Sequence, residues 1–345
     1  MNLLVITQKV DIKDGNLGFF HRWLEKFAEK VENLYVICLW QGEYHLPENV
    51  KVFSLGKERG ISKIGQLIRL QKYLIKILPR IDGIFIHMCP IYAIASFPLT
   101  KIFRKKMILW FLHRSVEWKL KLAEKCVDSI LTASAESCRL KNRKKIEIIG
   151  HGIDVDRFRP AENSLSFNKS IIFSAGRIAP SKDLETLIRA VDILVNQKNI
   201  KNILIKIAGS PLINSEKRYF EKIKNLIHEK KVEGYIEFLG SVPNTEMLKY
   251  YQEANIFINL SHTGSIDKVV LEAMACAVPV LTCNEAFQGI LDEKYFFKKK
   301  DYQGLTEKII NLRDADKDNS LREIVVRNHD LDDLIKKIIK KMKNE

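Results

Sequence analysis

The amino-acid sequence predicts an α/β protein with two doubly wound parallel sheets. The first observation is that apolar segments of strand type alternate with amphipathic segments of helical type through residues 2–149. The second is that this alternation stops at residues 150–169 and then starts again. The third is that 345 residues, 46% of them apolar, can bury two substantial cores. Together these observations indicate two Rossmann-like domains.

The interruption sets the expected domain boundary. The sequence Gly150-His151-Gly152 breaks the strand-and-helix pattern, and a polar segment follows as far as Lys169. We therefore expect a first domain at residues 1–155 and a second at residues 156–325. We expect residues 326–345 to contain a C-terminal helix that crosses back onto the first domain.

The first half begins with an apolar strand and a loop at residues 8–18. After this loop Phe19, Trp23, Phe27 and Val31 recur every four residues, which is the spacing of one helical face. The expected strands of this half are residues 2–7, 35–40, 50–55, 83–87, 107–112, 129–133 and 146–149. The expected helices are residues 19–31, 64–78, 92–102 and 116–125.

The second half repeats this order. The expected strands are residues 171–175, 204–208, 236–239, 256–260 and 278–281. The expected helices are residues 184–196, 219–230, 245–252, 268–277 and 331–343. No internal repeat of solenoid length is present.

Residues 261–282, SHTGSIDKVVLEAMACAVPVLT, form the most informative segment. An apolar strand, a turn of small and polar residues, a helix and a second strand follow one another, as in a βαβ unit. The free N–H groups and the dipole of that helix favour an anion at its start. Glu272 lies about one turn into the helix, where a carboxylate could hold a ribose hydroxyl. A nucleotide site is one interpretation, and an ordinary structural loop is the other.

The chain carries a formal net charge of +15. Basic residues cluster at residues 57–80, 101–106, 139–145 and 336–343. No helix-turn-helix, zinc-finger or aromatic-basic RNA-binding pattern accompanies them, which argues against nucleic acid as a partner. An anionic membrane surface or an anionic substrate fits this charge better, and a solvated basic surface is the alternative.

Compartment signals indicate a cytoplasmic protein. We find no apolar run of about 18 residues that would span a bilayer. The N-terminal residues lack the basic flank of a signal peptide and are expected to form a strand. No pair of cysteines has CxxC spacing, so we expect buried free thiols and no zinc.

The second half resembles the nucleotide-binding domain of the retaining glycosyltransferases of family four, the group 1 glycosyltransferases with the GT-B fold. The motifs that carry the resemblance are GHGIDVDRF, SAGRIAPSKDLETLIRAV, IEFLGSVPNTEMLKYYQEANIFINLS and TGSIDKVVLEAMACAVPVLT. They cover most of residues 148–283. The first half matches through its architecture and the loop DGNLGFF. The resemblance implies two Rossmann-like domains that face each other across a cleft.

The resemblance also implies roles for individual residues on the donor side. Arg177 and Lys182 match the basic pair that binds the donor diphosphate, where two cations would stabilise a departing anion. Glu272 matches the carboxylate that holds the ribose. The loop beside the base would contain Gly240, Ser241 and Val242, and the turn facing the donor would contain Ser265, Asp267, Lys268 and Val269.

The sequence departs from the family pattern at one position. Many members carry a glutamate eight residues before the one that matches Glu272, where it contacts the donor sugar. Gly264 occupies this position here. Asp267, three residues further on, could partly replace the missing carboxylate.

Residues of the first half are expected to complete the site. Gly18 matches the glycine that lets a helix start approach the donor phosphates. His113 ends a strand where the family often places a histidine against the donor sugar, and we count it with the catalytic candidates. His87 and Asp14 are candidates for the acceptor side. For both histidines a hydrogen-bonded structural role is the alternative.

The resemblance implies an enzyme of the hexosyltransferase type that moves a sugar from a nucleotide diphosphate sugar to a glycan or lipid-linked acceptor. It implies no cofactor and no bound metal. The charge suggests peripheral binding to the inner face of the plasma membrane. The alternatives are a sugar-nucleotide epimerase or a phosphorylase of the same fold, or a non-catalytic protein that binds nucleotide sugars.

Overall fold

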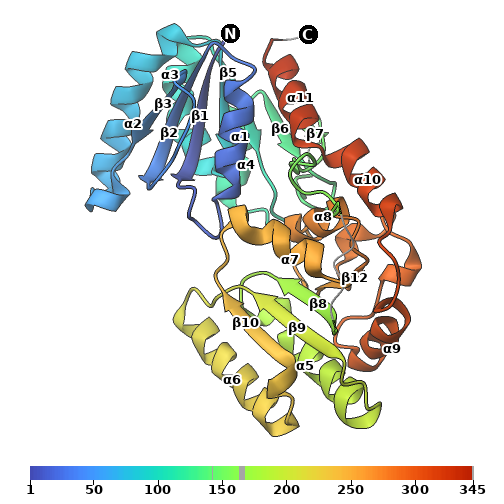
Figure 1. The fold of residues 1–345 in the computed structure, drawn as a ribbon. Coiled ribbons are helices and arrows are strands. Elements are labelled where there is room, and N and C mark those ends of the chain that lie inside the picture. Colours follow the sequence, from blue (N-terminus) through green and yellow to red (C-terminus); the bar gives the residue numbers. More distant parts are fainter. Residues whose placement is uncertain (142, 163–167, 344–345) are drawn as a thin grey trace. The chain divides into compact units, whose positions relative to one another are not determined.

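The computed structural model describes residues 1–141, 143–162 and 168–343 (Figure 1). Residues 163–167 of the expected polar segment, residue 142 of one basic cluster and the last two residues of the expected C-terminal segment 326–345 lie outside this description. The chain divides into two compact units. The first contains Met1–Asp154, Pro243–Thr245 and His329–Glu345, and the second contains Val155–Val242 and Glu246–Asn328.

A seven-stranded parallel sheet forms the centre of the first unit, with strand order β3-β2-β1-β4-β5-β6-β7. Its strands are β1 (Asn2–Val10), β2 (Asn33–Gln41), β3 (Val50–Ser54), β4 (Gly83–His87), β5 (Lys106–Trp110), β6 (Ser129–Thr132) and β7 (Ile146–Ile148). Its helices are α1 (Phe19–Ala28), α2 (Lys63–Ile77), α3 (Pro90–Ile102), α4 (Trp118–Cys126) and α11 (Leu331–Lys343). β1 pairs with both β2 and β4, so Leu4 lies between Tyr35 and Ile84.

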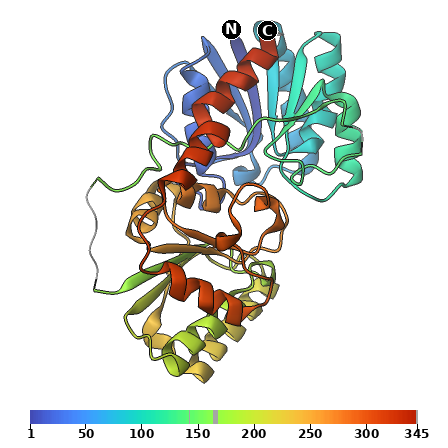
Figure 2. The same cartoon turned by 90° about the vertical axis from the view of Figure 1, so that its right-hand side faces the viewer.

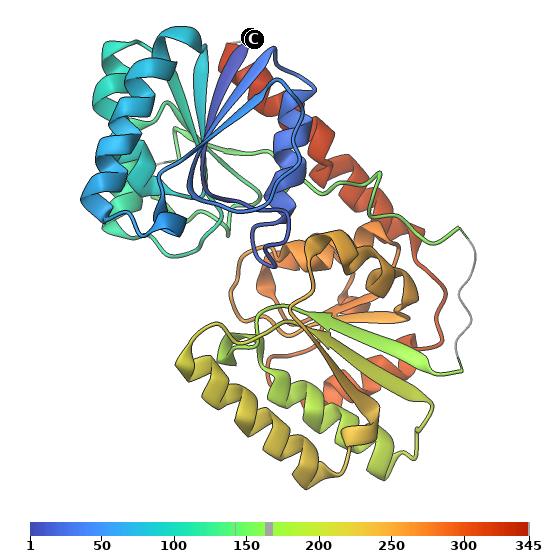
Figure 3. The same ribbon diagram turned by 60° about the vertical axis from the view of Figure 1, so that its left-hand side comes forward.

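Alternation along β1 divides the core of this unit into two layers. Leu4 and Ile6 pack with the inner faces of α2, α3 and α4, whereas Leu3 and Val5 pack with α1 and α11. Figure 3 shows α2 and α3 on one side of the sheet and α1 and α11 on the other. Figure 2 shows α11, in red, lying along its face of the sheet. The C-terminal helix therefore completes the hydrophobic core of the first unit.

A five-stranded parallel sheet forms the centre of the second unit, with strand order β10-β9-β8-β11-β12. Its strands are β8 (Ser170–Ala175), β9 (Ile203–Ala208), β10 (Ile236–Gly240), β11 (Ile256–Asn259) and β12 (Val280–Thr282). Its helices are α5 (Leu184–Asp192), α6 (Asn214–Lys230), α7 (Met247–Glu253), α8 (Lys268–Ala275), α9 (Tyr302–Leu312) and α10 (Asn319–His329).

The two faces of this second sheet carry different cores. Aliphatic side chains of α5, α6 and α9 pack on one face, with Leu187 and Ile188 fully buried. On the other face Tyr251 of α7 contacts the rings of Phe173 and Phe257, with centroid distances of 5.4 and 5.7 Å. Both faces are buried, as expected for a parallel sheet.

Two helices, α9 and α10, were not predicted from the sequence. Both have weak periodicity, because each buries one apolar pair four residues apart, Leu305 and Ile309 in α9 and Leu321 and Val325 in α10. A cap signal was present for α9, since Asp301 accepts a hydrogen bond from the Gly304 amide at 2.8 Å. Other boundaries shift by a few residues. The helix expected at residues 219–230 begins at Asn214, and the one expected at residues 268–277 ends at Ala275.

The cysteines are free thiols, but they are not uniformly buried. Cys38, Cys138, Cys276 and Cys283 are buried, whereas Cys89 and Cys126 are partly exposed. The expectation of buried thiols is therefore wrong for these two residues. In the part of the chain that the structure describes, no helix has both the length and the apolar character needed to cross a bilayer.

Candidate active site

Polar side chains gather at the carboxyl edge of the second sheet. The chain winds from β8 to β9 and β10 on one side and continues with β11 and β12 on the other side, so the winding direction reverses between β8 and β11. Open parallel sheets bind ligands at this point, outside the carboxyl ends of the strands. A small pocket lies there. Its lining consists of Ser174, Ala175, Gly176, Arg177, Lys182, Leu184, Ile207, Asn259 and Leu260.

Close backbone packing joins the loops at this edge. Gly176 and Gly209 have φ angles of 149° and 145°, and a Cβ atom on Gly209 would lie 1.9 Å from the carbonyl oxygen of Gly176. The Gly209 amide donates a hydrogen bond to the carbonyl of Gly240 at 2.7 Å. The loops after β8, β9 and β10 are thereby held together, and only glycine fits at Gly209.

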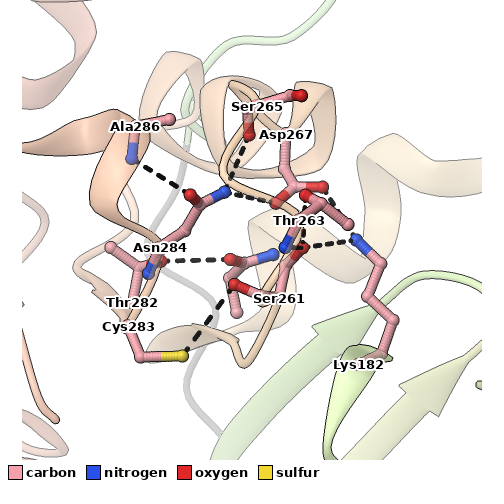
Figure 4. Close-up of polar contacts among 10 residues, drawn as sticks. Lys182, Ser261, Thr263, Ser265, Asp267, Thr282, Cys283, Asn284 and Ala286 are labelled. Carbon is pink, nitrogen blue, oxygen red and sulfur yellow. Dashed lines mark hydrogen bonds and ion pairs between the residues drawn. The ribbon is translucent and has the colours of Figure 1, made fainter. Parts of the chain in front are cut away.

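Lys182 points across the edge of the sheet from the loop after β8 toward the segment after β11. Its ammonium lies 2.7 Å from Asp267 Oδ1 and 3.0 Å from the hydroxyl of Ser261 (Figure 4). The side chain is 20% exposed. The next residue, Asp183, has a left-handed backbone with φ of 38°, and its carboxylate accepts a hydrogen bond from Thr186 at 2.8 Å. The start of α5 therefore fixes the base of the lysine side chain.

Arg177 lines the same pocket from the same loop. Its Nε lies 3.2 Å from Glu216 Oε1, and Glu216 also accepts a hydrogen bond from the Leu212 amide at 2.8 Å. Glu216 is buried at the start of α6, whereas the arginine side chain is 51% exposed. The contact uses Nε, and the planar guanidinium carries further donors on its two terminal nitrogens. A carboxylate thus orients the arginine beside the pocket.

Asp267 stands directly before α8, but its carboxylate does not cap that helix. It makes no hydrogen bond to the first helical amides, all of which the structure describes. Its two oxygens instead contact Lys182 and the Nδ2 group of Asn284, the latter at 2.8 Å (Figure 4). The same Nδ2 group donates to the carbonyl of Ser265, also at 2.8 Å. Asn284 therefore connects the turn before α8 with the loop after β12.

Gly264 has a φ angle of 65°, in the left-handed region. A residue with a side chain would be strained there by about 1–2 kcal/mol. The backbone at this position therefore favours glycine, and the position is not simply a glutamate site with its side chain removed. Ser265 follows Gly264, and Lys268 and Val269 lie at the start of α8.

Glu272 is buried inside the second unit, with 1% of its surface exposed. Tyr251 donates a hydrogen bond to its Oε2 at 2.8 Å, and Lys268 forms an ion pair with its Oε1. Burial and the neighbouring carboxylate raise the pKa of Tyr251 well above its usual value, so the tyrosine remains a donor. A ribose hydroxyl would have to use the lone pairs that these partners leave.

Gly240 ends β10 with a φ angle of 70°, and Ser241 and Val242 follow at the surface. The hydrogen bond from Gly209 places them at the same sheet edge as Arg177. The expected base loop and the expected diphosphate loop therefore lie next to each other. In the described ranges, no three His, Cys, Asp or Glu side chains gather as metal ligands would.

In the first unit, Gly18 and Asp14 build one loop. Asp14 Oδ1 accepts hydrogen bonds from the amides of Asn16 and Leu17 at 2.9 and 2.6 Å. Burial would raise the pKa of Asp14, but the Lys9 ammonium and these amides outweigh it, and the pKa is lowered. A Cβ atom on Gly18 would lie 2.4 Å from the Asp14 carbonyl oxygen. Glycine is therefore required at the start of α1 for packing alone.

The two histidines of the first unit differ in environment. His87 is buried, stacks on Phe20 with ring centroids 3.9 Å apart, and contacts the Thr7 hydroxyl at 3.3 Å. Burial lowers the pKa of His87 to about 3, so the ring is neutral at pH 7. These surroundings are those of a structural histidine. His113 is exposed after β5, where its Nδ1 accepts a hydrogen bond from the Ser115 amide at 3.1 Å.

A family comparison decides the classification of the chain. The sequence model described as "Glycosyl transferases group 1" matches residues 154–329, just over half of the chain. The chain belongs to the group 1 glycosyltransferases. The matched residues include Arg177, Lys182, Asp267 and Glu272, so the site at the sheet edge lies in the part of this glycosyltransferase that defines the family.

Curated relatives match over part of the chain. The D-inositol 3-phosphate glycosyltransferase of Streptomyces avermitilis is 26% identical over 152 residues, which cover 41% of this chain and 32% of that protein. The enzyme of the same name from Corynebacterium jeikeium is 28% identical over 146 residues, covering 39% of this chain and 35% of that protein. The chain thus matches these relatives over about a third of their length.

Solved structures match over the whole chain. Anabaena Alr3699/HepE in complex with UDP has a TM-score of 0.79 and 16% identity, and covers 100% of both chains. The sucrose-phosphate synthase of Thermosynechococcus elongatus has a TM-score of 0.77 and 14% identity, covering 100% of this chain and 99% of its own. At such identities the likeness concerns the fold. The prediction of the GT-B fold is confirmed.

Several residues of the site were missed from the sequence. Ser261 contacts Lys182, and Asn284 donates a hydrogen bond to Asp267. Glu216 pairs with Arg177, and Tyr251 donates a hydrogen bond to Glu272. None of them follows a motif with a fixed spacing to its partner. No sequence pattern pointed to Glu216, because the helix expected at residues 219–230 begins at Asn214 in the structure.

Proposed function

We propose that the chain is a retaining glycosyltransferase of family four and of the hexosyltransferase type. It would move a sugar from a nucleotide diphosphate sugar to a glycan or lipid-linked acceptor, in polysaccharide or glycolipid biosynthesis. The observation that carries this proposal is the position of Arg177 and Lys182 beside the pocket at the sheet edge. Support for a nucleotide-sugar donor comes from related folds, since HepE structures are described in complex with UDP and with UDP-glucose.

The proposed chemistry depends on stabilising the leaving group. When the bond between the sugar carbon and the diphosphate oxygen breaks, negative charge grows on that oxygen. In this proposal Lys182, Arg177 and the first amides of α8 would stabilise this charge. In this proposal Glu272 binds the ribose, and the loop from Gly240 to Val242 lies beside the base.

We propose that this chemistry needs no resident metal ion or cofactor. In this proposal the directed N–H donors of the two cationic side chains at the pocket would bind the diphosphate where other sites use a divalent ion. Turnover should therefore be unchanged after treatment with a chelator. A loss of turnover that added Mg²⁺ or Mn²⁺ restores would contradict this part of the proposal.

A panel of nucleotide sugars tests the function directly. With a suitable donor, the protein should release the nucleoside diphosphate slowly in water and faster with an acceptor. Arg177→Ala should lower this rate about 100-fold, since it removes a charge stabiliser. Conversion of the donor to its epimer would favour an epimerase, and pyridoxal phosphate absorbance would favour a phosphorylase. Tight nucleotide binding without any turnover would favour a non-catalytic protein, the alternative that the glycine at residue 264 keeps open.

We propose further that the protein acts in the cytoplasm and binds peripherally to an anionic membrane through α2. The exposed apolar stripe of this helix consists of Ile64, Leu67, Ile68 and Ile75, with exposed fractions of 74%, 49%, 51% and 54%. A neighbouring stripe of Leu70, Leu74 and Ile77 is buried in the core. The helix therefore has an outer apolar face in addition to the one that holds it to the sheet.

Charge favours a lipid surface as the occupant of this outer face. Lys63, Lys72 and Lys76 are exposed on the same helix. Exposed side chains also lie at the end of α3, where Lys101 and Ile102 are its last residues and Arg104 follows. Basic residues near an anionic surface contribute about 1 kcal/mol each, and the apolar stripe can enter the interface.

Co-sedimentation with liposomes tests this docking. Binding should require anionic lipid and weaken with added salt. It should fall when Lys63, Lys72 and Lys76 are changed to glutamine together. The control removes three exposed charges of the second unit, Lys217, Arg218 and Lys298, and should bind like the unchanged protein. If both triple variants lose liposome binding equally, the binding depends on net charge alone and not on α2. If the unchanged protein binds neither anionic nor neutral liposomes, the proposal is rejected.

A further inference from the structure

We propose that Asp267 is a specificity-determining residue that weakens the hold of the site on the nucleoside diphosphate product relative to the nucleotide-sugar donor. This inference rests on the proposed function. Its basis is the position of one carboxylate, which shares a lysine with the expected phosphate site.

Both cations of the pocket already have carboxylate partners. Lys182 pairs with Asp267 at 2.7 Å, and Arg177 pairs with Glu216 at 3.2 Å. The formal charge of these four side chains sums to zero. The site therefore attracts phosphate through directed N–H groups and the start of α8, with little net positive charge. An additional negative charge on a ligand therefore gains less binding free energy here than it would beside an unpaired lysine and arginine.

Asp267 is fixed in place by hydrogen bonds to both of its carboxylate oxygens. One of its oxygens accepts from Lys182 and the other from Asn284. Asn284 has no exposed surface, and its hydrogen-bonding groups are engaged. Its Nδ2 donates to Asp267 and to the Ser265 carbonyl, its Oδ1 accepts from the Ala286 amide at 3.0 Å, and its own amide donates to Thr282 Oγ1 at 3.1 Å.

The rigid support keeps Asp267 in place when a ligand binds. A carboxylate on a flexible side chain could turn away when a phosphate arrives. By turning away, Asp267 would lose two charge-assisted hydrogen bonds and leave one of the two Asn284 Nδ2 hydrogens without its acceptor. Its negative charge therefore stays beside Lys182 when the site is filled.

The nucleotide-sugar donor and the nucleoside diphosphate product differ in charge. The two phosphates of a nucleotide sugar are each bonded at both ends and carry two negative charges together. Release of the sugar leaves a terminal phosphate whose second pKa is about 6, so the product carries about one more negative charge at pH 7. Repulsion from Asp267 acts on this added charge. A like charge at a binding site discriminates against the more charged ligand.

The same repulsion acts during the reaction, because the leaving oxygen acquires part of that charge as the bond breaks. Asp267 thus slows bond breaking somewhat while it speeds release of the product. A neutral residue at this position should produce the reverse, with faster single-turnover cleavage and stronger inhibition by product.

Calorimetry with UDP and UDP-glucose on the full chain tests the inference, and ADP and GDP pairs serve if the uridine pair does not bind. Asp267→Asn and Asp267→Ser should bind the diphosphate about tenfold more tightly, and the nucleotide sugar at most about threefold more tightly. The serine variant guards against misfolding, because serine is a good residue to precede a helix. Glu229→Gln removes an exposed charge of α6 and should change neither affinity.

Each outcome is decisive. Equal changes for donor and product would assign Asp267 a structural role and overturn the inference. Weaker binding of UDP-glucose alone would show that Asp267 contacts the sugar, and would overturn it as well. If the unchanged protein binds a nucleotide and the Asp267 variants bind it with the same affinity, only this inference fails. If the unchanged protein binds no nucleotide or nucleotide sugar, the proposed function fails and the inference falls with it.

Discussion

The replacement Lys182→Ala tests the centre of the proposed site, because it should lower stability and turnover for separate reasons. The ammonium lies 2.7 Å from Asp267 and 3.0 Å from Ser261. Its removal leaves a mostly buried carboxylate without its counter-ion. Breaking a buried ion pair from one side costs about 3–5 kcal/mol. The two side chains are 20% and 14% exposed, so solvent reduces this cost, and Asn284 still donates to Asp267.

We therefore expect a loss of about 2 kcal/mol in the free energy of unfolding. For a unit of this size that corresponds to a fall in Tm of about 4–8 °C. Turnover should fall about 100-fold or more, since the variant lacks a cation at the leaving group. Such a fall equals about 2.7 kcal/mol of transition-state stabilisation.

A second replacement separates the two effects. In Lys182→Ala/Asp267→Asn the unpaired carboxylate is gone, so most of the stability should return while turnover stays low. Urea unfolding and initial rates of donor consumption provide the two measurements. Lys206→Ala is the matched control, because Lys206 pairs with Glu253 at 2.7 Å with side chains 16% and 24% exposed.

The control should lose stability and keep its turnover. Nearly normal turnover of Lys182→Ala would refute the assignment of the lysine to the leaving group. Recovery of turnover in the double variant would refute it too, since the loss would then come from a distorted fold.

Three further predictions concern other residues. Glu272→Gln should weaken binding of nucleoside diphosphate about tenfold, or about 1.5 kcal/mol, by loss of a charged acceptor, and unchanged affinity in calorimetry would remove Glu272 from the site. Gly18→Ala should lower the unfolding free energy by about 2 kcal/mol or more, because its Cβ would lie 2.4 Å from a backbone oxygen, whereas Gly234→Ala meets nothing within 4 Å and should unfold like the unchanged protein. His87, with a pKa of about 3 in the folded protein and about 6.5 when unfolded, contributes stability that is complete above pH 6.5 and is lost as the pH falls toward 3. Between pH 6.5 and pH 5 this loss amounts to about 2 kcal/mol, and His87→Gln should show a correspondingly smaller acid dependence in denaturant unfolding.

Local patterns in the sequence were sufficient for the architecture. The apolar segment 83–87 corresponds to β4 without any shift, and the helix expected at residues 331–343 corresponds to α11. Both elements bury a regular set of side chains, and this periodicity is visible in the chain itself. The helices α9 and α10 were missed because each buries a single apolar pair, which leaves little periodic signal.

The donor-side motif was also local. Arg177 and Lys182 lie five residues apart in one loop, so their common location could be inferred from the sequence and the family resemblance. The nature of their partners could not. Glu216 and Asp267 reach them from other loops, and Lys182 and Asp267 are 85 residues apart.

Short-range order along the chain was enough to predict the family, the two parallel sheets and the loop that carries the basic pair. The apolar residues of α2 that remain outside the core, and the carboxylates that neutralise the pair, became known from the folded chain. The same is true of Asn284, which fixes Asp267 beside Lys182. These features depend on distances between segments that are remote in sequence, and such distances exist only after the strands have assembled into a sheet.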